Sequence, residues 1–295
     1  MGEGGASFCA DNGVSRLASL YSRQGKKGPN QDAAILYQGF GTEDAGERHS
    51  PLLLLRHRAD CSYDSSDSDD GSSSDGSLVS AEVFDEWKEA SISAFKAMDK
   101  ELELHPQLNS FHSGTTAVTI IKEGRDLIIS NLGDSRAVMG TFSEEGDLKA
   151  VQLTTDLKPS LPREAERIRK NNGRVFALRD EPDIQRVWLP DSNFPGLAMA
   201  RAFGDFELKN YGVIATPQVS YRRLRDRDQF IVLATDGVWD VLSNDEVVKV
   251  AWLAFRQEED ASRAVVKAAV QAWRRKFPSR RADDCSAACI FLDDR

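Results

Sequence analysis

The sequence predicts an α+β protein in which β-sheets pack together and helices cover them from outside. Two observations lead to this prediction. Runs rich in β-branched and other apolar residues recur from the middle of the chain to its end, and segments of helical periodicity lie between them. The chain has 295 residues, which is enough for one large domain or two small ones.

The first part of the chain contains two segments that cannot form a core. Residues 1–20 are rich in Gly and Ser and are expected to be a disordered lead-in to a domain spanning residues 21–295. Residues 59–77, with the sequence ADCSYDSSDSDDGSSSDGS, are expected to form a solvated, disordered acidic loop within that domain.

Regular elements follow the acidic loop. Apolar residues recur at helical spacing over Ala81–Glu103, which predicts a helix. Thr116–Lys122 and Asp126–Asn131 are β-rich and are separated by Glu123-Gly124-Arg125, which predicts a hairpin. The remaining expected elements are strands at Ser135–Phe142, Gln229–Ala234 and Cys285–Leu292, and helices at Arg163–Asn171 (closed by Gly173), Asp245–Leu253 and Ala261–Arg274.

Composition and charge narrow the classes of function. The net charge of −9 argues against non-specific nucleic-acid binding, which needs a basic surface. It is consistent with simple solubility or with a carboxylate-rich pocket that cations neutralise. No apolar run approaches the roughly 18 residues of a membrane helix, so no membrane association is expected. The four cysteines show no CxxC spacing, and a reduced cytoplasmic or nuclear setting is expected.

Aspartates recur where strands end, beside small or turn-forming residues. They are Asp32, Asp134, Asp205, Asp236, Asp240, Asp283 and Asp284. Carboxylates gathered at the rim of a core repel one another, and hard cations such as Mg²⁺ or Mn²⁺ offset that repulsion. Any single one of them is also explained as a turn-forming residue.

An ordered series of motifs resembles the type 2C, metal-dependent serine/threonine protein phosphatases, most closely those of plants. The motifs are GPNQD, SGTTAV, NLGDSRAV, LTTDLKPSLPREAERI, GRV, LAMARAFGD, ATDGVWDVLSNDEVV and ADDCSAACIF. The resemblance implies a sandwich of two antiparallel sheets flanked by helices. It also implies two Mg²⁺ or Mn²⁺ ions, a phosphoprotein substrate and a monomeric protein.

The resemblance assigns roles residue by residue. Asp236, Asp283 and Asp32 match metal ligands, and Asp284 stands where the family has Asn. Asp134 and Asp240 match acids that hold a further, weaker ion or lie beside the metals. Lys27 stands where the family usually has a phosphate-gripping arginine, and lysine keeps the charge but loses the bidentate fork. The mechanism implied is in-line attack on phosphorus by a metal-held water, without a phosphoenzyme.

One family motif is not found. Between the first motif and the first long helix, the family has a strand ending in Asp-Gly-His-Gly, which supplies a bridging metal ligand and the proposed general acid. Here the chain runs from Gln38-Gly39-Phe40-Gly41 into the leucines at 52–55. No catalytic acid is therefore identified, and the four histidines, His49, His57, His105 and His112, are expected at the surface.

The missing motif leaves more than one reading of the function. One core strand is expected to be lacking, with an exposed edge beside it and reduced stability. The first reading is a Mg²⁺- or Mn²⁺-dependent phosphoserine/phosphothreonine phosphatase. The second is a non-catalytic pseudophosphatase, in a truncated or splice-variant form, that binds partners without turnover. A small-molecule phosphohydrolase on the same fold stays open, because fold does not fix substrate.

Overall fold

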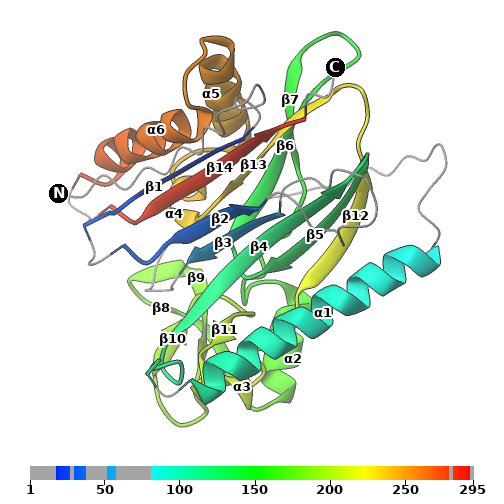
Figure 1. Ribbon diagram of the computed structural model, residues 1–295. Helices are drawn as coiled ribbons and strands as arrows, with labels where there is room; N and C mark the ends of the chain where they lie inside the picture. Colours follow the sequence, from blue (N-terminus) through cyan, green and yellow to red (C-terminus); the bar gives the residue numbers. More distant parts are fainter. Residues whose placement is uncertain are drawn as a thin grey trace.

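A computed structural model describes residues 18–26, 30–37, 52–57, 81–105, 107–278 and 282–292. Two antiparallel sheets form the centre of the molecule, and helices lie on their outer faces (Figure 1). The predicted α+β sandwich is therefore confirmed. Residues 1–17 and the acidic stretch at 59–77 lie outside the described residues, so the predicted disorder of both stays a prediction.

The first sheet has five strands in the order β1-β14-β13-β6-β7. They are β1 (Ala18–Arg23), β14 (Cys285–Phe291), β13 (Asp228–Ala234), β6 (Arg136–Phe142) and β7 (Leu148–Gln152). β1 begins at Ala18, so the last residues of the expected lead-in belong to the sheet. The first and last described strands lie side by side, because Ala18 pairs with Ile290 and Arg23 with Cys285.

The second sheet has the order β12-β5-β4-β3-β2, and a short strand, β11, also pairs with β4. Its strands are β12 (Gln218–Arg223), β5 (Asp126–Leu132), β4 (Gly114–Glu123), β3 (Leu52–His57), β2 (Ala33–Tyr37) and β11 (Phe203–Gly204). The predicted hairpin between β4 and β5 is confirmed. Gly124 at its turn has φ of +53°, a conformation that glycine adopts without steric cost.

β3 corrects one expectation from the sequence. The loss of the Asp-Gly-His-Gly motif predicts a gap and an exposed edge in this sheet. Instead, Leu54 pairs with Ile35 of β2 on one side and with Thr119 of β4 on the other. The expectation of an unpaired edge there is wrong, because the segment 52–57 has strand-forming length and composition and occupies the position between β2 and β4.

The two sheets share one hydrophobic core, which β13 shows most directly. Ile231 and Leu233 pack with residues of the second sheet such as Ile120 and Ile129. Their neighbours Phe230 and Val232 belong to a second cluster on the opposite face, beneath the helices. Side chains alternate between the faces of a strand, so a continuous apolar run such as QFIVLA fills both cores at once.

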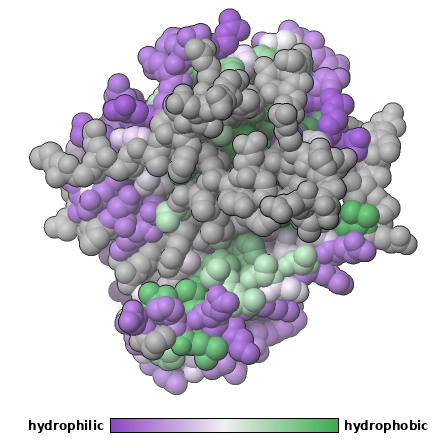
Figure 2. Space-filling model, viewed as in Figure 1, coloured by the Kyte–Doolittle hydropathy of each residue, from purple (hydrophilic) through white to green (hydrophobic). Residues whose placement is uncertain are grey.

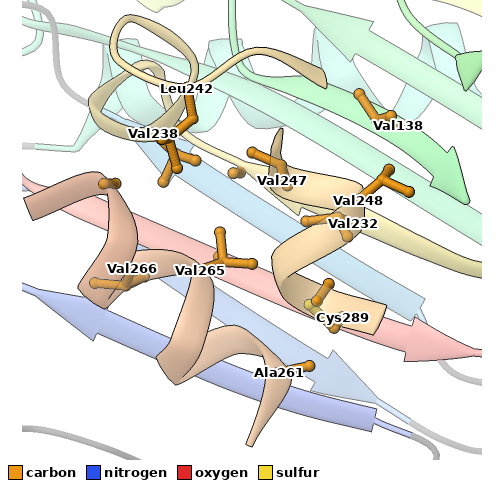
Figure 3. Close-up of a cluster of buried hydrophobic side chains, with 14 of the residues drawn as sticks. Val138, Val232, Val238, Leu242, Val247, Val248, Ala261, Val265, Val266 and Cys289 are labelled. Atoms are coloured by element: carbon orange, nitrogen blue, oxygen red, sulfur yellow. The ribbon is translucent and has the colours of Figure 1, made fainter. Parts of the chain in front are cut away.

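Helices cover the outer face of each sheet. α5 (Asn244–Arg256) and α6 (Ala261–Lys276) lie over the first sheet, and α1 (Ala81–Leu104) lies across the second (Figure 1). Valines of α5 and α6 meet Val138, Val232 and Cys289 of the strands below them (Figure 3). Ser243 and Glu246 form a reciprocal capping box that fixes the start of α5.

A third, three-stranded sheet lies beside the sandwich and is not predicted from the sequence. It comprises β10 (Pro195–Leu197), β9 (Glu181–Trp188) and β8 (Arg174–Leu178), with α2 (Pro162–Lys170) and α3 (Phe206–Lys209) close by in the chain. The predicted helix is confirmed as α2. Its end differs from the expectation, because Asn172, with φ of +62°, takes the left-handed position instead of Gly173.

Candidate functional site

The predicted metal-binding aspartates come from four separate segments. Asp32 precedes β2, and Asp134 lies in the turn between β5 and β6. Asp236 opens α4 (Asp236–Trp239), and Asp240 caps its end. Asp283 precedes β14. Asp134, Asp236 and Asp283 each lie close enough to Asp240 to act on its charge, so these four residues gather at one end of the sandwich.

Asp236 stands at the point where β13 gives way directly to α4. Thr235 has extended backbone angles and caps the short helix. Gly237 follows, and a Cβ atom there would collide with the carbonyl oxygen of Asp284. The Gly237 carbonyl accepts a hydrogen bond from Trp273 Nε1 at 2.7 Å. The Asp-Gly pair is therefore needed because the backbone passes against the segment that carries Asp283.

Asp32 is tied to the same point by a hydroxyl group. Thr235 Oγ1 donates to Asp32 Oδ2 at 2.8 Å. Thr235 Oγ1 also accepts a hydrogen bond from the backbone N–H of Ser286 at 3.1 Å. Thr235 is completely buried. Asp32 is thus held beside the strand end that delivers Asp236.

Asp283 and its neighbour Asp284 have different surroundings. The Asp284 carboxylate accepts from the backbone N–H of Gly25 at 2.6 Å and of Gln31 at 2.7 Å. Both of its oxygens are therefore engaged with the loop between β1 and β2. Asp283 Oδ1 accepts from the Asp284 N–H at 3.1 Å. Asp283 is among the residues whose charges act on Asp240, and the metal-ligand role implied for it stays a prediction.

The neighbouring carboxylates act on the pKa of Asp240. Burial raises the pKa of Asp240 well above its ordinary value, and the charges of Asp236, Asp134 and Asp283 raise it further. Lys158 partly offsets this effect. An excess of negative charge is therefore built into this end of the fold.

Lys158 and Arg136 are the cations near this cluster, and sequence reasoning assigned a role to neither. Burial lowers the pKa of Lys158, but the charges of Asp134, Asp240, Asp156 and Asp236 outweigh it and the pKa is raised. Arg136 binds the Asp156 carboxylate through Nε at 2.9 Å and through its terminal nitrogen at 2.6 Å. The sequence contained a signal for both residues, since Arg136 lies in the motif NLGDSRAV and Lys158 in the motif LTTDLKPSLPREAERI, each two positions after an aspartate.

Cys285 opens β14, directly after Asp283 and Asp284. Burial raises its pKa well above the usual range, and the charges of Asp32, Asp283, Asp236 and Asp284 add to the effect. Its thiol donates to the Gly237 carbonyl at 3.2 Å. Cys285 is therefore a neutral structural thiol and does not have the thiolate character of a nucleophile.

Other residues singled out in the sequence lie elsewhere. The charge of Asp205 acts on Lys209, which binds Asp99 at 2.7 Å. Lys27 lies outside the described residues, and so does His49. His105 and His112 are exposed, as predicted, and His112 contacts Glu207 at 3.1 Å.

The donor set fits a hard divalent cation in its chemistry. Carboxylate oxygens are the ligands that Mg²⁺ and Mn²⁺ prefer, and the raised pKa of Asp240 marks a concentration of charge that a cation would relieve. Within the described part of the chain, however, no three His, Cys, Asp or Glu side chains are grouped tightly enough to hold an ion as they stand. The cluster supplies ligands without forming a closed site.

Comparisons with known proteins agree with this fold and donor set. The family model described as "Protein phosphatase 2C" matches residues 23–276. The chain belongs to this family of protein phosphatases. It is 52% identical to "Probable protein phosphatase 2C 12" of Oryza sativa subsp. japonica, with all of this chain and 85% of that protein covered. It is 44% identical to "Probable protein phosphatase 2C 33" of Arabidopsis thaliana, covering 96% and 68%.

A solved structure supports the fold. The serine-threonine phosphatase 2C from Toxoplasma gondii superposes with a TM-score of 0.76 at 23% identity, covering 94% of each chain.

The alignment with the rice protein phosphatase extends over 334 residues, whereas this chain has 295, so the rice protein contains residues without a counterpart here. Among the described helices, none is both long and apolar enough to cross a membrane.

Proposed function

We propose that this protein removes phosphate from phosphoserine and phosphothreonine in proteins, with the help of Mg²⁺ or Mn²⁺. The observation that carries the proposal is the gathering of Asp134, Asp236, Asp240 and Asp283 from separate segments at one end of the sandwich. Membership of the phosphatase family supports the same reaction class. The protein acts as a monomer in the cytoplasm or nucleus.

The chain's own residues prepare this site in three ways. Thr235 fixes Asp32 beside Asp236 by a direct hydrogen bond. Asp284 holds the loop that contains Lys27, and we assign the grip on the substrate phosphate to Lys27. Lys158 moderates the repulsion among the carboxylates when substrate approaches.

Asp236, Asp283 and Asp32 are the residues that would hold the divalent cations, with Asp134 and Asp240 beside them. When bound, the cations supply charge neutralisation for the phosphate and lower the pKa of a water molecule. Because the ligands are not grouped in advance, binding must draw like charges together, so we expect weak affinity and slow turnover.

The test is phosphate release from an aryl phosphate and from a phosphothreonine peptide, with Mn²⁺ and with EDTA. The matched variant is Asp236→Asn, which keeps the shape of the side chain and removes its charge. The proposal predicts turnover that requires Mn²⁺ and disappears in the variant. Equal phosphate release by both proteins, when circular dichroism reports both as folded, would sink it.

A non-catalytic binding protein is the second candidate. Two observations favour it: the described residues include no closed set of metal ligands, and the rice relative contains residues that this chain lacks. This candidate predicts that a phosphothreonine peptide binds without being hydrolysed. Titration of a labelled phosphopeptide in EDTA and in Mn²⁺, followed by analysis of the recovered peptide, separates the two candidates.

A further inference from the structure

α6 differs in charge from the rest of the chain. The protein has a net charge of −9, yet residues 261–276 contain five basic residues and no acidic one. These are Arg263, Lys267, Arg274, Arg275 and Lys276. A helix end explains the last three in part, because cations there offset the helix dipole. It does not explain Arg263 and Lys267, which lie toward the other end of the helix.

Three of these cations share one helix face. Lys267 follows Arg263 by four positions, and Arg274 follows Lys267 by seven, so their side chains form a row along α6. All three are exposed, and in the described part of the chain none of them forms an ion pair. The charges of Arg275 and Lys276 act instead on Glu246 of α5, whose pKa they help to lower.

Two residues of the row, Arg263 and Lys267, line an open groove between α6 and β1. The groove has a volume of about 760 Å³, and Arg23, Tyr21, Arg263, Lys267 and Gln271 contribute to its lining. The Arg263 guanidinium lies 5.7 Å from the centre of the Tyr21 ring, which fixes it at the groove wall. Hydrophilic residues dominate the visible described surface on the side of the molecule where α5 and α6 lie (Figure 2).

The acidic residues of the groove are confined to one end. Glu259 and Asp260 precede α6, and Asp260 caps the helix by accepting the Arg263 N–H at 3.0 Å. From there, α6 and β1 run in the same direction. Ser262, near the start of α6, contacts Ser19 of β1. Trp273, near the end of α6, donates to the Gly237 carbonyl, which also accepts from Cys285, the residue that pairs with Arg23 at the end of β1. The cationic part of the groove therefore leads toward the aspartate cluster.

The groove reaches the candidate site through Arg23. Arg23 pairs with Cys285 and stands two residues before Gly25, whose N–H binds Asp284. We propose that this groove, lined by Arg23, Arg263 and Lys267, binds an acidic segment of a protein partner, namely the Asp- and Glu-rich sequence flanking a phosphorylated residue. The identity of the partner as a substrate rests on the proposed function, whereas the binding of an acidic segment does not.

The dimensions and charge favour this occupant. Arg263 and Gln271, which both line the groove, are about 12 Å apart along the helix axis, which matches about four residues of an extended peptide. A chain of net charge −9 repels acidic phosphoproteins at a distance, and a cationic groove beside the site steers them toward it. A groove that runs between a helix and a strand suits an extended peptide chain better than it suits a flat anionic surface.

The test measures binding directly, in EDTA and without phosphate. A fluorescent peptide rich in Asp and Glu, and its Asn/Gln counterpart, are titrated with wild-type protein and with the Arg263→Glu/Lys267→Glu double variant. We expect the Kd of the acidic peptide to rise at least about tenfold in the double variant, and binding to weaken as salt increases. Lys249→Glu, an exposed lysine on α5 outside the groove, is the matched control and should change Kd less than about twofold.

Several results would overturn the proposal. Equal binding of the acidic peptide by wild type and double variant places its site elsewhere, and equal binding of the Asn/Gln peptide removes charge as the cause. The same titrations with phosphatidylserine vesicles and with single-stranded RNA address other anions. If either binds through Arg263 and Lys267 while the acidic peptide does not, the groove serves that ligand instead. Loss of phosphatase activity alone leaves this inference standing and rejects only the proposed function.

Discussion

Two regions of the described structure hold buried or half-buried carboxylates in opposite electrostatic surroundings. Glu164 in α2 is buried and meets Arg201 at 2.6 and 3.0 Å and Arg167 at 2.6 Å. At the end of the sandwich, Asp134, Asp236, Asp240 and Asp283 act on one another, with Lys158 as a partial offset. The first arrangement stabilises the fold, whereas the second keeps a surplus of negative charge.

The pKa directions express the same contrast. Burial alone would raise the pKa of Glu164, but the hydrogen bonds and charge of Arg201, and then the charge of Arg167, overcome it and the pKa is lowered. The pKa of Asp240 is raised by burial and by its neighbours. A buried acid with fitted partners belongs to the architecture, and a cluster of like charges points to a ligand from outside.

Breaking the ion pair between Arg201 and Glu164 should have the largest effect on the free energy of unfolding. Arg201→Ala removes the bidentate partner of a buried carboxylate, and we expect the free energy of unfolding to fall by about 3 kcal/mol. Urea unfolding followed by circular dichroism measures this. Lys170→Ala breaks the exposed Lys170–Glu166 pair at 2.8 Å and should cost less than about 1 kcal/mol. Similar losses in the two variants would contradict the contrast.

Asp284 is an intermediate case, since it lies beside the cluster but has fitted partners. Asp284→Asn replaces one acceptor oxygen by an N–H₂ group that faces a backbone donor, Gly25 or Gln31. We expect a loss of about 2 kcal/mol in the free energy of unfolding. Asp147→Asn, at an exposed turn, should stay within about 0.5 kcal/mol. A neutral Asp284→Asn would show that the loop does not depend on this carboxylate.

Neutralising one carboxylate of the aspartate cluster should raise the free energy of unfolding, whereas the two preceding substitutions lower it. Asp240→Asn removes one of several like charges from a half-buried position, and we expect the metal-free protein to gain about 1 kcal/mol of stability at neutral pH. The same urea titration in EDTA reports it. Asp245→Asn, in the first turn of α5, is the comparison and should lose a few tenths of a kcal/mol, because an acid there is favourable. Destabilisation by Asp240→Asn would show that the cluster is paired after all.

The pH dependence gives the smallest and most specific effect. Because the pKa of folded Asp240 lies above its ordinary value of 3.8, its negative charge costs stability at neutral pH, and protonation removes that cost as the pH falls through the raised pKa. The stability difference between Asp240→Asn and wild type should therefore narrow as the pH falls from neutral toward 3.8. A difference that stays constant over this range would mean that the pKa is not raised.

Glu164 should behave in the reverse manner in the same titration. Its pKa is lowered from 4.5, so its stabilising contribution is complete above that value and is lost as the pH falls through the lowered pKa. Wild-type stability should consequently decline steeply only in acid below about pH 4.5. The contributions of Asp240 and Glu164 to stability should thus change in different ranges of pH, because the two pKa values shift in opposite directions.

The strongest local patterns of the sequence were sufficient to predict much of the fold. The run QFIVLA became β13, and the periodic segments after it became α5 and α6, because burial of a regular apolar pattern needs no knowledge of distant residues. The ordered motifs likewise identified the family and placed Asp236 and Asp283 on the segments that meet at one end of the sandwich.

Weak patterns failed, because tertiary contacts decide them. The three-stranded sheet has short strands with partly exposed faces, and one of its most deeply buried side chains, Arg186, is polar and pairs with Glu181 at 2.7 Å. No apolar alternation marks such a segment. The place of β3 in the second sheet was also decided by pairing with β2 and β4, which a search for a missing motif does not reveal.

The sequence by itself thus determined the class of fold, the family and the aspartates available for chemistry. The tertiary structure alone decided that Asp284 holds a loop while Asp283 joins the cluster, that Lys158 lies among the carboxylates, and that Arg23 meets the cationic face of α6. The reason is distance along the chain. Gly25 and Asp284 are 259 positions apart, and only the packing of the first described strand against the last brings them into contact.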